Sequence, residues 1–145
     1  PWDKIVSFYK WTLRHLEEKT GHGVILVVKN LVDKYNFSEL NFHNFITILP
    51  EIHWWSMMLN CEVFLFENGQ NKLNFIGRVE NIEEDFNIVC NKVGILNSNL
   101  LYKNNNTKSI KTDKHYTEYY TDFTRDFVAK RYAKDIEYFG YKFGG

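Results

Sequence analysis

The sequence contains little cysteine, little proline and no long apolar run. Among its 145 residues are 2 cysteines and 2 prolines, which excludes the dense disulfide framework of many small secreted domains. No stretch of about eighteen uncharged apolar residues occurs, so the sequence predicts no membrane-spanning helix. The first residues already have the pattern of a helix interior, and no signal peptide is recognisable in them.

An excess of charge of one sign is missing as well. The 18 basic and 18 acidic side chains give a formal net charge of zero, so no global field attracts nucleic acid or an anionic membrane. A site for an anion therefore has to be local. The 5 histidines are scattered, and neither Cys61 nor Cys90 has a second thiol at the spacing of metal ligands, so no metal site is predicted.

The chain does contain enough apolar material for one packed domain. Hydrophobic residues make up 44% and aromatic residues 17% of the sequence, and a chain of this length buries roughly two thirds of its unfolded surface. The clearest local pattern lies in residues 73–94. Leu73 to Val79 favours a β-strand, and Ile82 to Val93 favours an amphipathic helix that ends at Gly94.

Asn81 is the predicted N-cap of that helix, with Glu84 reaching back to complete a capping box. A strand with a helix packed on it is the core unit of an α/β layer, so an α/β fold is expected. Cys90 lies on the apolar face of the helix and is expected to be a buried, reduced thiol.

Further segments carry secondary-structure signals. Residues 1–18 and 121–139 have helical periodicity, the second with Thr121 as its N-cap and Gly140 as its stop. Another helix is predicted from its N-cap Ser38 to Pro50. Residues 24–28, VILVV, fit either a short strand or a buried helix, and residues 61–66 favour a strand before a turn at 67–71.

Three stretches, in this order, resemble a known family. They are PWDKIVSFYKW at the start, FIGRVENIEEDF with Gly-Ile after its helix, and HYTEYYTDFTRDFVAKRYAKDIEYFGYKF at the end. Together they resemble the carbohydrate sulfotransferases related to the chondroitin and dermatan enzymes and their bacterial relatives. The resemblance covers most of the chain and is poor from about Gly21 to Phe45.

This resemblance implies a fold, a donor and an acceptor. The fold is the C-terminal portion of a P-loop-like α/β sulfotransferase fold, helix-rich with a few core strands, with residues 1–145 as a single partial domain. The reaction moves a sulfuryl group from 3′-phosphoadenosine 5′-phosphosulfate to a carbohydrate hydroxyl, with no metal required. The localisation stays open, since a bacterial or viral enzyme is expected in the cytoplasm and a full-length eukaryotic one in the Golgi lumen.

In the resembling family an Arg-x-Pro block and a Ser six residues after the Pro hold the 3′-phosphate of the donor. Pro1 and Ser7 keep that spacing, and the Arg would stand two residues before Pro1. The free N–H groups of a helix N-terminus suit an anion, and the Ser7 hydroxyl adds a donor. The resemblance therefore implies that Ser7 binds the nucleotide, and the alternative is an ordinary surface serine.

Two further stretches supply candidate binding residues. Residues 96–113 form a predicted polar loop in the place where related enzymes carry a basic loop over the donor's phosphates. The resemblance implies phosphate binding by lysines of the cluster Lys103, Lys108, Lys111 and Lys114, without a choice among the four, and the alternative is that they are ordinary lysines of a solvated loop. His53 and Trp54 resemble the family's His-Trp segment near the donor and acceptor cleft. Their alternative is a place in the core or an interface.

Arg78 and Glu80 match the family's Arg-x-Glu pair, whose role looks architectural, and no catalytic residue is assigned. The family's 5′-phosphosulfate loop and its base lie upstream of the Arg-x-Pro block, and Gly21 and Gly23 do not provide such a loop. The chain alone is therefore expected to be inactive, to need an N-terminal half and to associate through exposed apolar edges. The alternative is a non-catalytic binding or structural module derived from the same fold.

Overall fold

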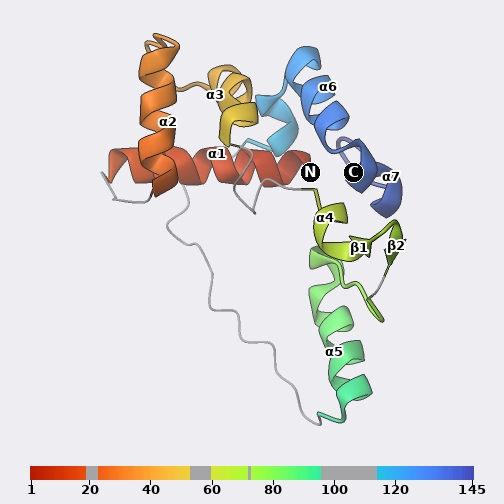
Figure 1. The fold of residues 1–145 in the computed structure, drawn as a ribbon. Helices are drawn as coiled ribbons and strands as arrows, with labels where there is room; N and C mark the ends of the chain where they lie inside the picture. The colour runs from red at the N-terminus through yellow and green to blue at the C-terminus, as the bar shows by residue number, and fades with distance from the viewer. Residues whose placement is uncertain (19–22, 53–59, 72, 96–113) are drawn as a thin grey trace. The chain divides into compact units, whose positions relative to one another are not determined.

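The computed structural model describes residues 1–18, 23–52, 60–71, 73–95 and 114–145. The chain divides into two units (Figure 1), with Pro1–Phe64 and Lys108–Gly145 in unit 1 and Leu65–Thr107 in unit 2. In the described part of the chain, no helix is both long enough and apolar enough to cross a membrane.

Unit 1 is helical. Its described elements are α1 (Trp2–Glu17), α2 (Gly23–Lys34), α3 (Phe42–Ile48), the 3-10 helices η1 (Leu49–Ile52) and η4 (Tyr116–Tyr119), α6 (Asp122–Arg131) and α7 (Ala133–Phe139). The short α4 (Glu62–Leu65) contains the boundary between the units. Unit 2 contains β1 (Phe66–Glu67), β2 (Gln70–Asn71), the 3-10 helix η3 (Val79–Asn81) and α5 (Ile82–Val93).

Helix α1, predicted from its periodicity, is the element against which the rest of unit 1 packs. It contacts α2, α3, η4 and α6, and its inner face buries Ile5, Phe8 and Tyr9. The buried hydroxyl of Thr12 on this face donates to the carbonyl of Phe8 at 2.8 Å, so its burial is not penalised. The core also holds apolar side chains from the other elements: Val24, Ile25, Val28, Phe45, Ile46, Ile48, Leu49, Ile52, Val128 and Tyr132.

The apolar run at residues 24–28 is helical, which decides between the two predicted alternatives. Val24, Ile25, Val28 and Leu31 are buried, and their spacing places them on one face of α2. Five apolar residues alone do not distinguish strand from helix, but Leu31, one turn beyond the run, continues the helical period.

The predicted cap of the third helix is wrong. Helix α3 begins at Phe42, and its N-cap is Asn41, whose side chain accepts from the Asn44 backbone N–H at 2.9 Å. Ser38 lies too far upstream to reach the free N–H groups of this helix. The α-helix also ends at Ile48, and Pro50 belongs to η1, whose tighter turn continues to Ile52.

The C-terminal segment confirms the predicted cap and stop but forms two helices. The Thr121 side chain accepts from the Thr124 N–H at 3.3 Å, and Gly140 ends α7 in the left-handed region at φ 70°. Between α6 and α7 the buried Tyr132 has φ −108° and ψ 26°, which interrupts the predicted single helix. No proline or glycine occurs at this interruption, and Tyr132 is fully buried there.

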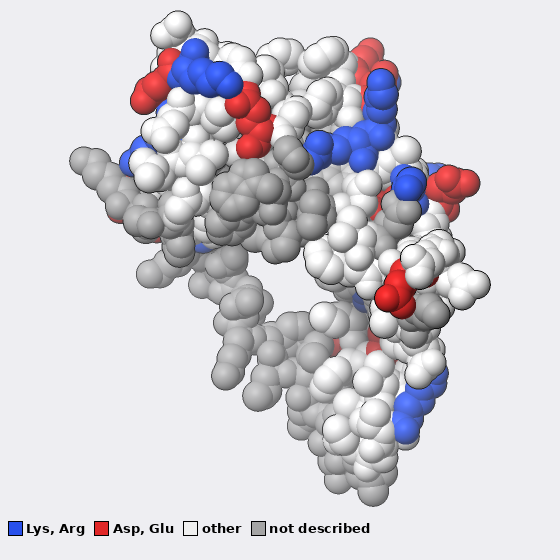
Figure 2. Space-filling model, viewed as in Figure 1, with Lys and Arg blue, Asp and Glu red and all other residues white. Residues whose placement is uncertain are grey.

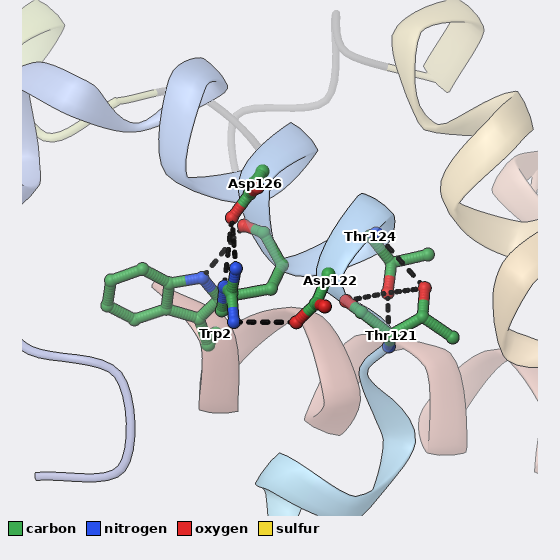
Figure 3. Close-up of polar contacts among 6 residues, drawn as sticks. Trp2, Thr121, Asp122, Thr124 and Asp126 are labelled. Carbon is green, nitrogen blue, oxygen red and sulfur yellow. Dashed lines mark hydrogen bonds and ion pairs between the residues drawn. The ribbon is translucent and has the colours of Figure 1, made fainter.

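The C-terminal segment is tied to α1 by polar contacts as well as by burial. The Trp2 indole Nε1–H donates to the Arg125 carbonyl at 3.3 Å (Figure 3), and the Tyr120 hydroxyl donates to the Trp2 carbonyl at 2.9 Å. Tyr119 also packs edge-on against Tyr9, with 6.3 Å between ring centroids. Further aromatic residues of this segment, Tyr141 and Phe143 among them, are partly buried against the helical core, whereas Tyr138 is exposed.

In unit 2 the predicted strand from Leu73 to Val79 is wrong. The described strands are β1 and β2, an antiparallel hairpin whose turn residues Asn68 and Gly69 have φ 51° and 76°. This hairpin confirms the turn predicted at 67–71. The strand predicted at 61–66 is wrong for most of its length. Residues 62–65 form α4, and of this run only Phe66 pairs with a neighbouring strand.

The backbone after the hairpin bonds to side chains instead of a strand. The Leu73 N–H donates to the Asn71 side chain at 2.8 Å, and the Arg78 N–H donates to the Asp85 carboxylate at 2.6 Å. Asn81 precedes α5 as predicted but makes no side-chain cap, so the expected capping box is absent. Gly94 ends α5 at φ 78° as predicted, and Cys90 is buried and free.

The described residues are therefore helix-rich with a small two-stranded sheet, consistent with the predicted α/β class. The finer assignment to a P-loop-like fold stays a prediction. Most of the predicted sheet is absent from the described residues, because the segments expected to form it are helical or irregular.

Alkaline pH is expected to destabilise unit 1 through its buried tyrosines. Burial raises the pKa of Tyr120 and of Tyr132 above the ordinary value of about 10. Below that value tyrosine is neutral in both states and this contribution is fully present. As pH rises through about 10, the unfolded chain loses these protons while the folded chain keeps them, so the free energy of unfolding falls.

Denaturant unfolding followed by circular dichroism between pH 8 and 11 measures this slope. Tyr120→Phe removes one of the ionisable groups, so its stability is expected to fall less steeply with pH than that of the parent chain. Phe123→Leu is the control, since Phe123 is 62% exposed and does not ionise, and its slope is expected to match the parent's. Equal slopes for the parent and Tyr120→Phe would contradict the explanation.

Candidate functional site

Ser7, the predicted nucleotide ligand, lies on the exposed face of α1. The opposite face is fixed by the buried side chains of Ile5 and Phe8, so the Ser7 hydroxyl is accessible to solvent. Lys10 and Arg14 follow Ser7 by three and seven residues, which places them on the same face of the helix. One hydroxyl and two cationic side chains therefore share about two helical turns.

Lys10 is held toward the segment that precedes α6. Its Nζ lies 5.1 Å from the centroid of the Tyr119 ring, a cation–π contact. Tyr119 is itself fixed against Phe42, with 5.7 Å between ring centroids. An ammonium group has three N–H donors, so this contact with a ring face leaves donors for an anion.

Lys114 is the predicted loop lysine that the structure describes. It is exposed and stands directly before His115, the N-cap of η4. The His115 N–H donates to the Glu118 carboxylate at 2.8 Å, and η4 packs on α1. Ser7 and Lys114 therefore belong to two segments of unit 1 that are in contact. Lys108, Lys111, His53 and Trp54 lie outside the described residues.

Two other cations of unit 1, Arg125 and Lys34, have acidic partners. Arg125 forms ion pairs with Asp122 at 2.8 Å and Asp126 at 2.9 Å (Figure 3), and Lys34 pairs with Glu51 at 2.8 Å. On the face drawn in Figure 2, basic side chains lie beside acidic ones. These pairs neutralise charge locally, so Arg125 and Lys34 are weaker candidates for an anion site than Lys10.

The Arg78 and Glu80 pair lies in unit 2, where Arg78 is the N-cap of η3 and Glu80 is part of it. Asp85 accepts from the Arg78 N–H, and a Cβ on Gly77 would lie 3.4 Å from the Asp85 Cβ. This turn therefore packs against the first turn of α5 at ordinary contact distance. These contacts are compatible with the predicted architectural role of the pair.

A second polar cluster in unit 1 was not predicted from the sequence. Asp135 is 5% exposed, and its carboxylate accepts from the Cys61 N–H at 2.8 and 3.1 Å. Burial raises the pKa of the Cys61 thiol, Asp135 raises it further, and Lys4 opposes them. A nucleophilic cysteine needs a lowered pKa, so this cluster does not favour a reactive thiolate. Its hydrogen bonds instead connect α7 to Cys61, the residue before α4.

Across the described ranges, no three His, Cys, Asp or Glu side chains lie close enough to hold a metal ion. The sequence analysis missed Lys10 and Arg14, although their helical spacing from Ser7 was available as a signal. It also missed Asp135, which only the tertiary structure brings to Cys61.

A family model described as the sulfotransferase family matches residues 1–142. No curated protein and no solved structure matches the chain. The family match includes α1 with Ser7, the segment with Lys114, and α6 and α7, so it extends over both ends of unit 1.

Asp135→Asn is expected to make Cys61 more reactive. The substitution removes the negative charge that raises the pKa of the thiol, while the amide oxygen still accepts from the Cys61 N–H. The thiolate fraction near pH 8 then increases, and reaction with a disulfide reagent is expected to accelerate by about threefold or more. Cys90 is 4% exposed and contributes little to the rate.

The reaction is followed by absorbance of the released thiolate. Asp126→Asn, an exposed substitution in the adjacent helix, is the control and is expected to react at the parent's rate. A rate for Asp135→Asn equal to or below the parent's, in a chain that circular dichroism shows to be folded, would contradict the assigned effect of Asp135.

Proposed function

The chain belongs to the sulfotransferase family, and we propose that it is the C-terminal part of a carbohydrate sulfotransferase that uses 3′-phosphoadenosine 5′-phosphosulfate. In this proposal residues 1–145 form a partial domain of a P-loop-like fold and bind the 3′-phosphate end of the nucleotide. The observation that carries it is the family match over residues 1–142, which begins in the helix that exposes Ser7.

The chemistry of the exposed face of α1 suits a phosphate monoester. Such a group carries a charge of about −1.5 to −2 at neutral pH and offers three acceptor oxygens. The Ser7 hydroxyl provides one donor, the Lys10 ammonium a point charge, and the Arg14 guanidinium a fork that matches two phosphate oxygens. Asp3, on the same face one turn before Ser7, confines this favourable region to the Ser7–Arg14 turns.

The remaining phosphates of the donor are assigned to the loop lysines Lys108, Lys111 and Lys114. Lys114 supports this assignment because it leads into η4, which packs on α1. His53 and Trp54 are proposed to line the cleft for the acceptor, where an aromatic ring stacks on a sugar. No catalytic role is proposed for either residue, and no metal is proposed to take part.

Sulfuryl transfer requires a base and donors to the leaving phosphate in addition to the residues that bind the nucleotide. The acceptor hydroxyl oxygen forms a bond to sulfur while the bond from sulfur to the 5′-phosphate oxygen breaks, leaving adenosine 3′,5′-bisphosphate. A base takes the hydroxyl proton, and donors stabilise the charge on the leaving phosphate. We propose that this base and the 5′-phosphosulfate loop come from outside residues 1–145, so that the chain alone binds nucleotide but does not transfer.

Calorimetric titration of the chain with adenosine 3′,5′-bisphosphate at low salt tests the proposal, with AMP as the ligand that lacks the 3′-phosphate. The bisphosphate is expected to bind more tightly than AMP. Ser7→Ala removes one hydrogen bond to a charged group and is expected to weaken bisphosphate binding by about tenfold. Arg14→Gln is expected to weaken it and to reduce its dependence on salt.

Ser38→Ala is the matched control, because Ser38 is an exposed serine of unit 1 that is not part of α1. Its affinity is expected to equal the parent's. An affinity for Ser7→Ala equal to the parent's would remove Ser7 from the site. A folded chain that binds neither nucleotide would reject the proposed half-site and favour a non-catalytic binding or structural module.

A further inference from the structure

Helix α5 of unit 2 carries an apolar stripe that the described residues leave largely uncovered. Ile82, Phe86, Val89 and Val93 recur with the spacing of one helix face. Ile82 is 44% and Val93 is 63% exposed. The stripe is extended at its N-terminal end by Val79, 82% exposed, and beyond its C-terminal end by Ile95, also exposed.

A groove runs along the N-terminal part of this stripe. It has a volume of about 400 Å³ and is lined by apolar side chains of α5 and of the segment before it, with Arg78 and Asp85 at its polar edge. Gly77 contributes no side chain to the groove wall. The groove is therefore open and mostly apolar, with room for more than one apolar side chain of a partner surface.

The charged side chains of α5 are acidic at its N-terminal end and basic at its C-terminal end. The first turn of α5 carries Glu83, Glu84 and Asp85, of which Asp85 flanks the stripe and Glu84 lies on the opposite face. Lys92 in the last turn flanks the stripe on the side of Asp85, with its Nζ 5.2 Å from the centroid of the Phe75 ring of the same chain. A parallel copy of this helix would place acidic turns and like helix-dipole ends together. An antiparallel copy would place the acidic turn of each helix near the Lys92 turn of the other, which is favourable for both side chains and dipoles.

We propose that this face is a self-association surface, on which α5 of one chain pairs antiparallel with α5 of a second copy. The pairing is isologous, so each contact occurs twice. The stripe centres between Phe86 and Val89, and this register sets Val79 and Ile82 of each copy against the C-terminal end of the other. Val93 of the second copy then lies against Ile82 at the edge of the groove.

The contact area between the two helices is small, so weak dimerisation is expected. A helix of 12 residues is about 18 Å long, and a pair of such helices buries an area at the low end of specific interfaces. The expected dissociation constant is therefore about 10–100 µM, corresponding to a dimer that dissociates on dilution. Val79, Ile82 and Val93 supply the apolar area that changes on association.

Sedimentation velocity of the full chain between about 5 and 500 µM tests the surface. The parent chain is expected to shift from monomer to dimer over this range. Val79→Ser combined with Val93→Ser removes apolar surface at exposed positions, so the fold is retained and the dissociation constant is expected to rise at least about tenfold. Leu26→Ser is the control, since Leu26 of α2 is 62% exposed, and it is expected to dimerise like the parent.

A parent chain that stays monomeric at 500 µM would overturn the proposal and indicate that the face takes a different partner. Dimerisation of the double serine variant at the parent's concentration would place the interface elsewhere and also overturn it.

Cysteine cross-linking tests the orientation in a Cys61→Ser background. The antiparallel pairing brings position 82 close to position 93 of the second copy, so Ile82→Cys with Val93→Cys is expected to cross-link under mild oxidation. Val93→Cys alone places its two thiols about 16 Å apart along the pair and is expected to cross-link little. Efficient cross-linking by Val93→Cys alone would overturn the antiparallel arrangement.

Discussion

Burial of one face of α1 is the constraint on which the rest of unit 1 depends. Helices α2, α3 and α6 and the turn η4 all contact this helix, and Ile5, Val6 and Phe8 are almost completely buried beneath them. Each such side chain contributes roughly 1.5–3 kcal/mol on removal from water. Because a helix has a fixed period, burial of this face also forces Ser7, Lys10 and Arg14 outward.

A few polar contacts determine how the distant C-terminal segment joins this core. Hydrogen bonds from Trp2 to Arg125, from Tyr120 to Trp2 and from Cys61 to Asp135 connect parts of unit 1 that are far apart in sequence. Apolar burial has no direction, whereas these bonds specify which backbone groups meet. The sulfotransferase family match includes both ends of unit 1, which agrees with their dependence on one another.

Unit 2 differs from unit 1 in how much apolar surface its described residues bury. Its described residues bury Cys90 but leave much of the apolar stripe on α5 exposed, and the turn before α5 is held by the Asp85 carboxylate. This unit is thus fixed locally by turns, by a two-residue hairpin loop and by the Gly94 stop. Its apolar face is available for association, which is why the proposed self-association surface lies here and the proposed nucleotide site lies on α1.

The sequence by itself determined the elements with local causes: the α1 helix, the Thr121 cap, the stops at Gly94 and Gly140 and the turn at 67–71. Residues 24–28 and 73–79 needed the tertiary structure, because a strand exists only if a neighbour accepts its hydrogen bonds. The family resemblance named Ser7 as a candidate ligand, and this role stays a prediction. Only the folded chain held Lys10 against Tyr119 and brought Asp135 to Cys61, because cross-chain contacts leave no period in the sequence.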